Sequence, residues 1–183
     1  EPCCFGNVSF LLKGPSYRVR GWETQIVARP LHGLTVTGSA AWNSGSLTSS
    51  PLLYDIAGKP ITSIPNPFGA PGSPPSQSPP FSGNLRVRYE FEFGEYQAFV
   101  QAGGNHQAHS YSATGNATTF DQAGFTTYDA SLGAGKDAWL VQIVGQNLTD
   151  TRANLYENNS QAITAIIPNR PRTVGLRFSY RLR

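Results

Sequence analysis

The residues best suited to bind a metal ion are two histidines and two cysteines. His106 and His109 lie three positions apart in a polar stretch, a spacing that puts them on opposite faces of an extended strand. Cys3 and Cys4 are adjacent and match no zinc-ligand spacing. We expect the histidines to be ordinary polar residues. We expect the cysteines to form a vicinal disulfide, or a bonded loop pair, in an oxidising compartment. Neither a metal site nor a cofactor is predicted.

Charged residues alternate with apolar ones along residues 85–93. Arg86, Arg88, Glu90 and Glu92 share one face of a predicted strand, where they can form an ion-pair ladder with neighbouring strands. Solvation and packing in a polar channel is the simpler expectation, and contact with a ligand is the alternative.

Three aromatic residues, Tyr111, Phe120 and Tyr156, fall in polar stretches that we expect to be loops. They can stack on a ligand or simply anchor the loops, and anchoring is the simpler expectation. A G-x-G-x-x-A pattern begins at Gly133, but a strand follows it where a nucleotide site needs a helix. No G-x-S-x-G elbow occurs. The sequence therefore predicts no enzyme and assigns no ligand-binding residue.

Seven stretches alternate between apolar and polar residues. The clearest is 174–182, where Val174, Leu176, Phe178 and Tyr180 alternate with polar residues. A period of two is typical of a strand with one apolar face. The predicted strands are residues 17–29, 34–43, 85–93, 96–104, 126–133, 139–147 and 174–182.

Tight turns and long loops alternate between these strands. The turns fall near residues 30–33, 94–95 and 134–137, and the loops cover 44–80, 105–122 and 150–170. Segment 44–80 holds nine of the fourteen prolines, which remove the backbone donors that a sheet interior needs. An antiparallel sheet would thus carry its short turns at one end and its long loops at the other.

Membrane strands explain this pattern better than a soluble core does. The predicted strands exceed the ~5–6 residues usual in soluble sheets and approach the ~9–11 of tilted membrane strands. Aromatic residues lie near strand ends on the apolar face, where interfacial girdles belong: Trp42, Phe93, Tyr96, Trp139 and Tyr180. Turning Arg86, Arg88 and Arg177 toward lipid would cost roughly 2–4 kcal/mol each near the midplane, so we expect them to face a wet lumen.

The predicted fold class is therefore all-β, an antiparallel up-and-down transmembrane β-barrel with short periplasmic turns and long extracellular loops. A soluble, secreted β-sandwich that binds carbohydrate is the alternative, in which the same apolar faces would form a core. Partitioning distinguishes the two, since a sandwich would be a detergent-free monomer with a cooperative melt.

The charge content of the chain argues against one class of partner. Charged residues make up 14% of the 183 residues and the net charge is +3, so no nucleic-acid partner is predicted. No apolar run is long enough for a transmembrane helix. Methionine is absent, and seven strands cannot close a bacterial barrel alone, because such barrels have even strand numbers. We therefore expect residues 1–183 to be a piece of a longer protein.

Four motifs, in this order and spacing, resemble the C-terminal end of TonB-dependent receptors of Gram-negative outer membranes. The first two are similar to strand segments of that family, the third to the end of a strand before an extracellular loop, and the fourth to its closing strand. They are Arg20-Gly21-Trp22-Glu23, residues 34–39 (LTVTGS), residues 145–150 (GQNLTD) and residues 171–177 (PRTVGLR).

The resemblance implies a fold, a function and a location. Members are barrels of about 22 strands plugged by an N-terminal domain, and they import scarce nutrients with energy passed from TonB. Residues 1–183 would be the last seven strands, without the plug. The implied partners are outer-membrane lipid, an imported siderophore-iron, cobalamin or glycan ligand, and the TonB system through the absent N-terminal region. A bacterial barrel would also make the glycosylation sequon at Asn147 irrelevant.

Overall fold

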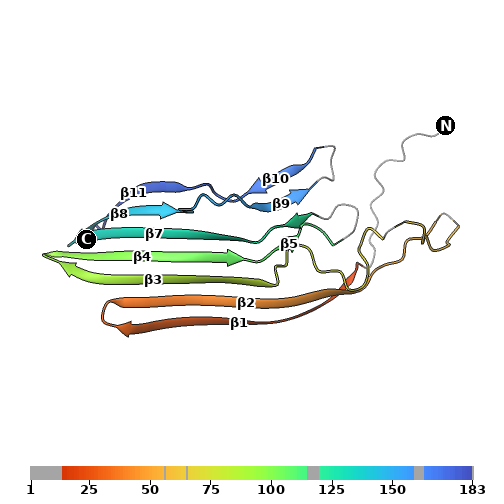
Figure 1. Ribbon diagram of the computed structural model, residues 1–183, viewed down its shortest axis with the longest axis horizontal. Coiled ribbons are helices and arrows are strands. Elements are labelled where there is room, and N and C mark those ends of the chain that lie inside the picture. The colour runs from red at the N-terminus through yellow and green to blue at the C-terminus, as the bar shows by residue number, and fades with distance from the viewer. Residues whose placement is uncertain (1–13, 56, 65, 115–119, 159–162, 183) are drawn as a thin grey trace.

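Seven long antiparallel strands form one sheet in the computed structural model, which describes residues 14–55, 57–64, 66–114, 120–158 and 163–182 (Figure 1). Their order in the sheet is their order along the chain. The strands are β1 (Ser16–Leu31), β2 (Leu34–Ser49), β3 (Phe81–Phe93), β4 (Tyr96–Gln107), β7 (Phe125–Lys136), β8 (Trp139–Gln146) and β11 (Thr173–Tyr180). This meander confirms the predicted all-β, antiparallel, up-and-down architecture.

Short turns and long connections lie at opposite ends of the sheet (Figure 1). The β1–β2 turn needs glycine, because Gly33 has φ +77° and a Cβ there would lie 2.2 Å from the Glu90 carbonyl oxygen. Two small hairpins, which the sequence pattern did not predict, lie within the long connections. They are β5 (Ser110–Tyr111) with β6 (Asp121–Gln122), and β9 (Asn154–Asn158) with β10 (Ala165–Pro168).

The predicted loop 44–80 is too long at its start, since β2 continues to Ser49. The first residues of β1 provide the pairing that extends it, with Arg20 opposite Ser44 and Ser16 opposite Ser49. β2 contains no proline, and the next proline along the chain is Pro51. No backbone donor is therefore missing from the extended ladder. The proline-rich connection is therefore residues 50–80.

The sheet has an apolar face and a polar face. Residues directly opposite each other in an antiparallel pair lie on the same face of the sheet. The register therefore shows on which face each paired residue lies. The apolar face carries the large hydrophobic side chains, many of them exposed: Trp22, Ile26, Trp42, Leu85, Val87, Tyr89, Phe91, Phe93, Tyr96, Val100, Leu132, Trp139, Val141, Ile143, Val174, Leu176, Phe178 and Tyr180. The polar face carries most of the charged and amide residues between them.

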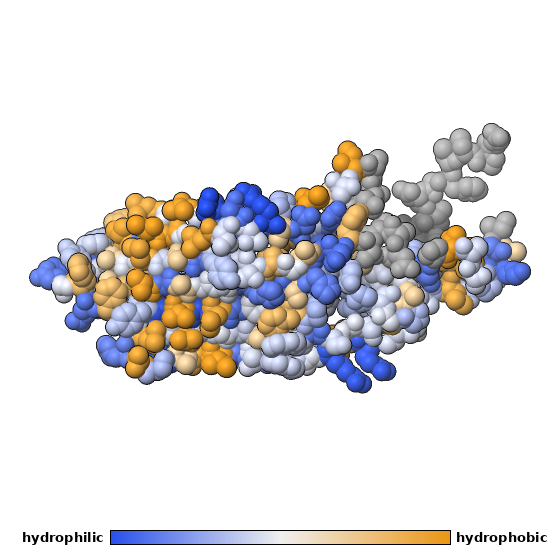
Figure 2. All heavy atoms as spheres, viewed as in Figure 1, coloured by the Kyte–Doolittle hydropathy of each residue, from blue (hydrophilic) through white to orange (hydrophobic). Residues whose placement is uncertain are grey.

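Very little of this apolar surface is covered. Leu47, Phe99 and Ala153 are the buried hydrophobic residues among those described, and all three lie off the apolar face, whereas Phe178 is 65% exposed and Leu176 is 75% exposed. Figure 2 shows hydrophobic side chains gathered over the stranded half of the molecule rather than over the loops. The β-sandwich alternative needs two packed sheets, and the long strands in the described part of the chain form one.

The sheet is open, with β1 and β11 at its two edges. Each of these strands has one hydrogen-bonded neighbour among the described residues, and its other edge presents unpaired backbone groups. No helix in the described ranges is long and apolar enough to cross a membrane.

Candidate functional site

A groove lined by amides and two charged groups lies on the polar face, toward the end that carries the long connections. It measures about 120 Å³, and its polar lining comes from Asn84, Arg86, Gln101, Asn105, Asp129, Ser131 and Gln146. Gly103 lies beneath it, where a Cβ would approach the Leu85 carbonyl oxygen to 3.1 Å. This set offers donors and acceptors suited to hydrogen bonding. The described residues contain no group of His, Cys, Asp and Glu that could hold a metal ion.

The proline-rich connection folds over the polar face of β2. Leu47 is 1% exposed beneath it. The Leu47 backbone N–H donates to the Ser73 carbonyl oxygen at 2.8 Å, and the Leu47 carbonyl accepts from the Gly72 N–H at 2.8 Å. A Cβ at Gly45 would lie 2.7 Å from Pro75. Backbone pairing of this kind, rather than a repeated side-chain pattern, positions the loop.

The long connections are also joined to one another. The Gln77 N–H donates to the Tyr111 carbonyl oxygen at 2.7 Å. The Thr114 hydroxyl oxygen accepts from the Ser76 N–H at 3.1 Å and from the Tyr17 hydroxyl at 3.2 Å. The β6 strand in turn contacts β9. Together the three connections form a layer of loops at one end of the sheet, which we call the loop layer (Figure 1).

The three aromatic residues that were expected in loops all lie in this layer. Tyr111 lies in β5 with its ring edge-on to His109, at a centroid distance of 5.7 Å. The Phe120 N–H donates to the Ser112 hydroxyl at 2.9 Å, and Tyr156 pairs with Ile167 between β9 and β10. Stacking of these rings on a ligand stays a prediction.

The two histidines have separate surroundings. His106 ends β4 on the apolar face, where its Nδ1 lies 2.8 Å from the Thr126 hydroxyl and its ring lies near Phe81. His109 follows the strand and contacts Tyr111. Cys3 and Cys4 lie outside the described residues.

The predicted ion-pair ladder is only partly present. Arg88 pairs with Glu90 of its own strand at 2.8 Å, and its guanidinium also stacks over Phe99, 3.6 Å from the ring centroid. Within the described chain neither Arg86 nor Glu92 forms an ion pair. The register explains this, because the residues opposite Arg86 are Thr37 and Gly103, which carry no charge.

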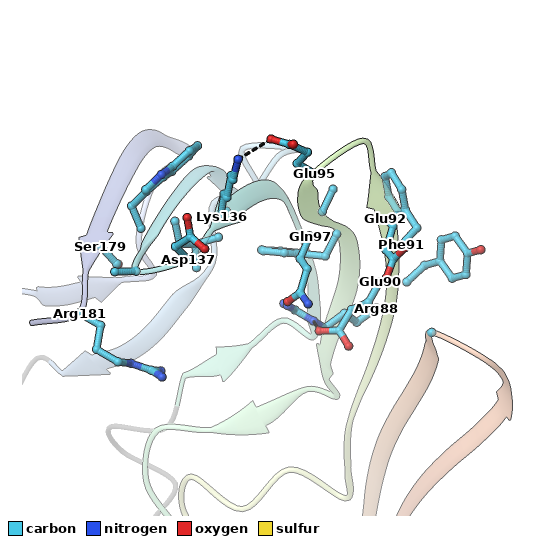
Figure 3. Close-up of a pocket in the computed structure, with 18 of the residues that line it drawn as sticks. Arg88, Glu90, Phe91, Glu92, Glu95, Gln97, Lys136, Asp137, Ser179 and Arg181 are labelled. Carbon is cyan, nitrogen blue, oxygen red and sulfur yellow. Dashed lines mark hydrogen bonds and ion pairs between the residues drawn. The ribbon is translucent and has the colours of Figure 1, made fainter. Parts of the chain in front are cut away.

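Phe99 fills the polar face near the turn end. It is 5% exposed and lies directly opposite Gly133, where a Cβ would come within 2.6 Å of its ring. A glycine shielded by a cross-strand aromatic residue is a recurrent device of curved sheets. Figure 3 shows the hollow around this position, with Arg88 and Glu90 on β3 and the ion pair between Lys136 and Glu95 at the turn end. The pattern did not predict Phe99, since a lone aromatic on a polar face breaks the alternation.

Asn147 fastens the last long connection. It is 4% exposed and has φ +49°, a conformation that asparagine tolerates better than most residues. Its amide nitrogen donates to the carbonyl oxygens of Thr151 (3.0 Å) and Arg170 (2.9 Å), and its amide oxygen accepts from the Thr151 N–H (3.0 Å). Its own N–H donates to Asp129 at 2.8 Å. The end of β8 is thereby tied to the residues just before β11, and the sequon amide is fully engaged.

Asp150 closes the same connection. Its carboxylate accepts from the Arg172 backbone N–H at 2.9 Å and from the Arg152 guanidinium at 3.0 Å. The backbone hydrogen bond from Arg172, followed by the side-chain bond from Arg152, holds the pKa of the Asp150 carboxyl below its usual value. The sequence identified the motif at residues 145–150, but it did not predict that the motif holds the connection between β8 and β11 by hydrogen bonds.

Two rows of aromatic rings cross the apolar face. At the loop end, Trp22 stacks on Trp42 at 4.3 Å, Trp42 lies 4.2 Å from Phe81, and Phe81 lies 5.7 Å from His106. At the turn end, Tyr96 packs edge-on to Trp139 at 5.7 Å, with Phe93 and Tyr180 as cross-strand partners. The sequence placed Trp42 and the turn-end row correctly. It missed Trp22 and Phe81, the latter because β3 begins four residues earlier than predicted.

Comparison with known proteins gives a matching family model and several similar solved structures, two of which are described here. Residues 4–148 match the family model described as "TonB dependent receptor-like, beta-barrel". The siderophore receptor PiuA from Acinetobacter baumannii superposes with a TM-score of 0.70 at 18% identity, covering 91% of this chain and 22% of that one. The ferric yersiniabactin uptake receptor FyuA from Yersinia pestis gives 0.70 at 17% identity, with 91% and 24% covered. The chain thus spans under a quarter of either structure. No curated protein matches the sequence.

Proposed function

Because the chain belongs to the TonB dependent receptor-like β-barrel family, we propose that it forms the last seven strands of a nutrient receptor in a Gram-negative outer membrane. The open edges of β1 and β11 would pair with strands of the same barrel that precede this segment. A plug domain and the contact with TonB would belong to the N-terminal region of the whole protein.

The uncovered apolar face carries this proposal. Its hydrophobic residues are exposed in the sheet, and lipid is the environment that makes such a surface stable. The length of the strands also fits a membrane. The 13 residues of β3, at ~3.4 Å each and a tilt of about 40°, span roughly 30 Å of membrane thickness. This is about the thickness of a bilayer hydrocarbon core, and Phe81 and Phe93 at its ends belong to the two aromatic rows.

The polar face then lines the lumen, and the loop layer lies outside the cell. Short turns on the periplasmic side and long loops outside are the usual asymmetry of these barrels. A ligand would meet the loop layer first and the amide-lined groove around Arg86 and Asp129 next.

For the ligand, we propose a ferric siderophore ahead of cobalamin or a glycan. The support is the pair of structural neighbours, which are a siderophore receptor and a ferric yersiniabactin uptake receptor. Beside the Asp129 carboxylate, the groove offers four amides, one hydroxyl and one guanidinium, whose N–H and O–H donors suit a ligand rich in oxygen acceptors.

Uptake by cells tests this function. The complete gene would be deleted and then restored in an iron-starved host, and uptake of radioactive iron would be measured for a panel of siderophores, with and without functional TonB. We expect at least one siderophore to require both the gene and TonB. If deletion changed uptake of no siderophore, cobalamin or glycan, the receptor proposal would be wrong.

A further inference from the structure

Charge on the apolar face is confined to three residues. Within the register of the seven long strands, the charged residues on this face are Arg18, Arg20 and Lys136. The acidic residues of the same paired stretches, Glu23, Glu90, Glu92 and Asp129, all take the polar face. Lys136 lies at the turn end and forms an ion pair with Glu95.

Arg18 and Arg20 differ from Lys136 in both position and partners. Both are exposed, and neither guanidinium has a hydrogen bond or an ion pair with the part of the chain that the structure describes. They share the face of Trp22, because β1 pairs with β2 without a register shift from Tyr17 to Ala28. Ser46 and Ser44 are their cross-strand partners. Within the described ranges, the result is a patch of two arginines and two hydroxyls that no acidic side chain neutralises.

The aromatic row fixes the depth of this patch. Arg20 precedes Trp22 by two residues and Arg18 precedes it by four, so both lie on the loop-end side of the row. At ~3.4 Å per residue and a tilt of about 40°, the two Cα atoms lie roughly 5 and 10 Å beyond the row along the membrane normal. The headgroup region of a bilayer occupies about 5–8 Å on each side of the hydrocarbon core. Both guanidinium groups can therefore reach headgroup level while their stems lie along the apolar surface.

The contacts of the proline-rich connection with this part of β2 are on the face opposite the patch. That loop covers Leu47 and approaches Gly45, which take the opposite, polar face of β2. The anionic groups at headgroup depth in the outer leaflet are the phosphates of its glycolipid, and a guanidinium binds phosphate bidentately. Hydroxyls at Ser44 and Ser46 add donors on the neighbouring strand.

We infer that Arg18 and Arg20, with Ser44 and Ser46, form a binding site for the phosphorylated sugar headgroup of an outer-leaflet lipid of the lipid A type. The Trp22, Trp42 and Phe81 rings would contact the apolar part of the same lipid. This site lies outside the barrel and is separate from the ligand path proposed above, although it rests on the same membrane placement.

Purified full-length receptor in detergent provides the test. Binding would be measured by native mass spectrometry with three probes: diphosphoryl lipid A, phosphate-free lipid A and inorganic phosphate. We expect diphosphoryl lipid A to bind at least ~10-fold more tightly than the phosphate-free lipid, given the strength of charge-assisted hydrogen bonds. Equal binding of the two lipids would overturn the inference without any variant. Full displacement by millimolar inorganic phosphate would also overturn it, by showing a site for the free ion.

Two variants then locate the site. The double variant R18Q/R20Q should lose the preference for diphosphoryl lipid A, whereas Arg177→Gln, on the polar face of β11, should keep it. Adding S44R and S46R to the double variant returns two charges to the same patch and should restore the preference. Unchanged binding by R18Q/R20Q would contradict the assignment. Heat-modifiable gel mobility, recorded for every variant, reports barrel insertion separately, so that failure of the membrane placement is distinguished from failure of the lipid site.

Discussion

At the scale of single residues, Asn147 stabilises the connection between β8 and β11. Its amide holds two carbonyl oxygens and one N–H across that connection. Asn169 stabilises the same connection. Its side-chain amide donates to the Thr151 carbonyl oxygen at 2.9 Å and accepts from the Ala153 N–H at 3.1 Å. The connection between β8 and β11 is therefore held at its base by the side-chain amides of two buried asparagines.

Asn147→Ala should loosen this connection. The variant leaves buried backbone groups without partners, which costs about 1–3 kcal/mol for each group, and alanine tolerates positive φ poorly. Hydrogen exchange in residues 148–158 and 163–172 of the full-length protein should accelerate. Asn154→Ala, an exposed position in the same connection, is the matched control and should exchange like the wild type. Equal exchange in both variants would show that the Asn147 amide does not stabilise the connection.

Asp150 gives the same connection a dependence on pH. Because hydrogen bonds from Arg172 and Arg152 lower its pKa in the folded protein, its stabilising effect is fully present above the usual value of 3.8 and is lost as the pH falls through the lower folded value. Proteolysis of the connection by an acid-active protease should therefore increase steeply in strong acid. In Asp150→Asn this step should be absent, and a step of the same size in that variant would contradict the role of the carboxylate.

At the scale of elements, the strands could be predicted and the loops could not. Long strands such as β3 and β11 repeat the alternation often enough to reveal both faces, and a residue such as Arg177 then takes the polar face by energetic cost alone. The hairpins β5–β6 and β9–β10 contain two to five residues per strand, too few for a period. The fold of residues 50–80 depends on backbone bonds at Leu47, which no residue pattern encodes. The candidate groove also escaped prediction, because its members come from four strands whose register was unknown.

The two faces of β11 predict opposite responses to charge. Phe178→Arg puts a guanidinium on the apolar face, two residues inside the turn-end aromatic row, where the cost lies below the roughly 2–4 kcal/mol of the midplane. Ser179→Arg puts the same group on the polar face beside water. In the full-length receptor, the Phe178 variant should show reduced outer-membrane levels and a weaker heat-modifiable shift, and the Ser179 variant should resemble the wild type. Equal levels and equal shifts for the two variants would refute the assigned faces.

At the scale of the whole molecule, one sheet carries three separate surfaces. In the proposed receptor, the apolar face would meet lipid, the polar face would line a lumen, and the loop layer would cover the end where a ligand arrives. If the protein were soluble, the apolar side chains of β11 from Val174 to Tyr180 would be exposed to water. The two edges of the open sheet would also have no hydrogen-bonded partner. Placement in a receptor barrel would account for both features, since lipid would cover the first and further strands would pair with the second.

The most direct test of this account is the accessibility of two matched tags in intact cells. Gly58, in the loop layer, and Gly94, in the β3–β4 turn, both have positive φ and open space around a Cβ, so a short epitope can be inserted at either site in the full-length protein. The account predicts that antibody labels the tag at Gly58 on intact cells and the tag at Gly94 only after the outer membrane is permeabilised. Labelling of both tags on intact cells, or of neither, would contradict it.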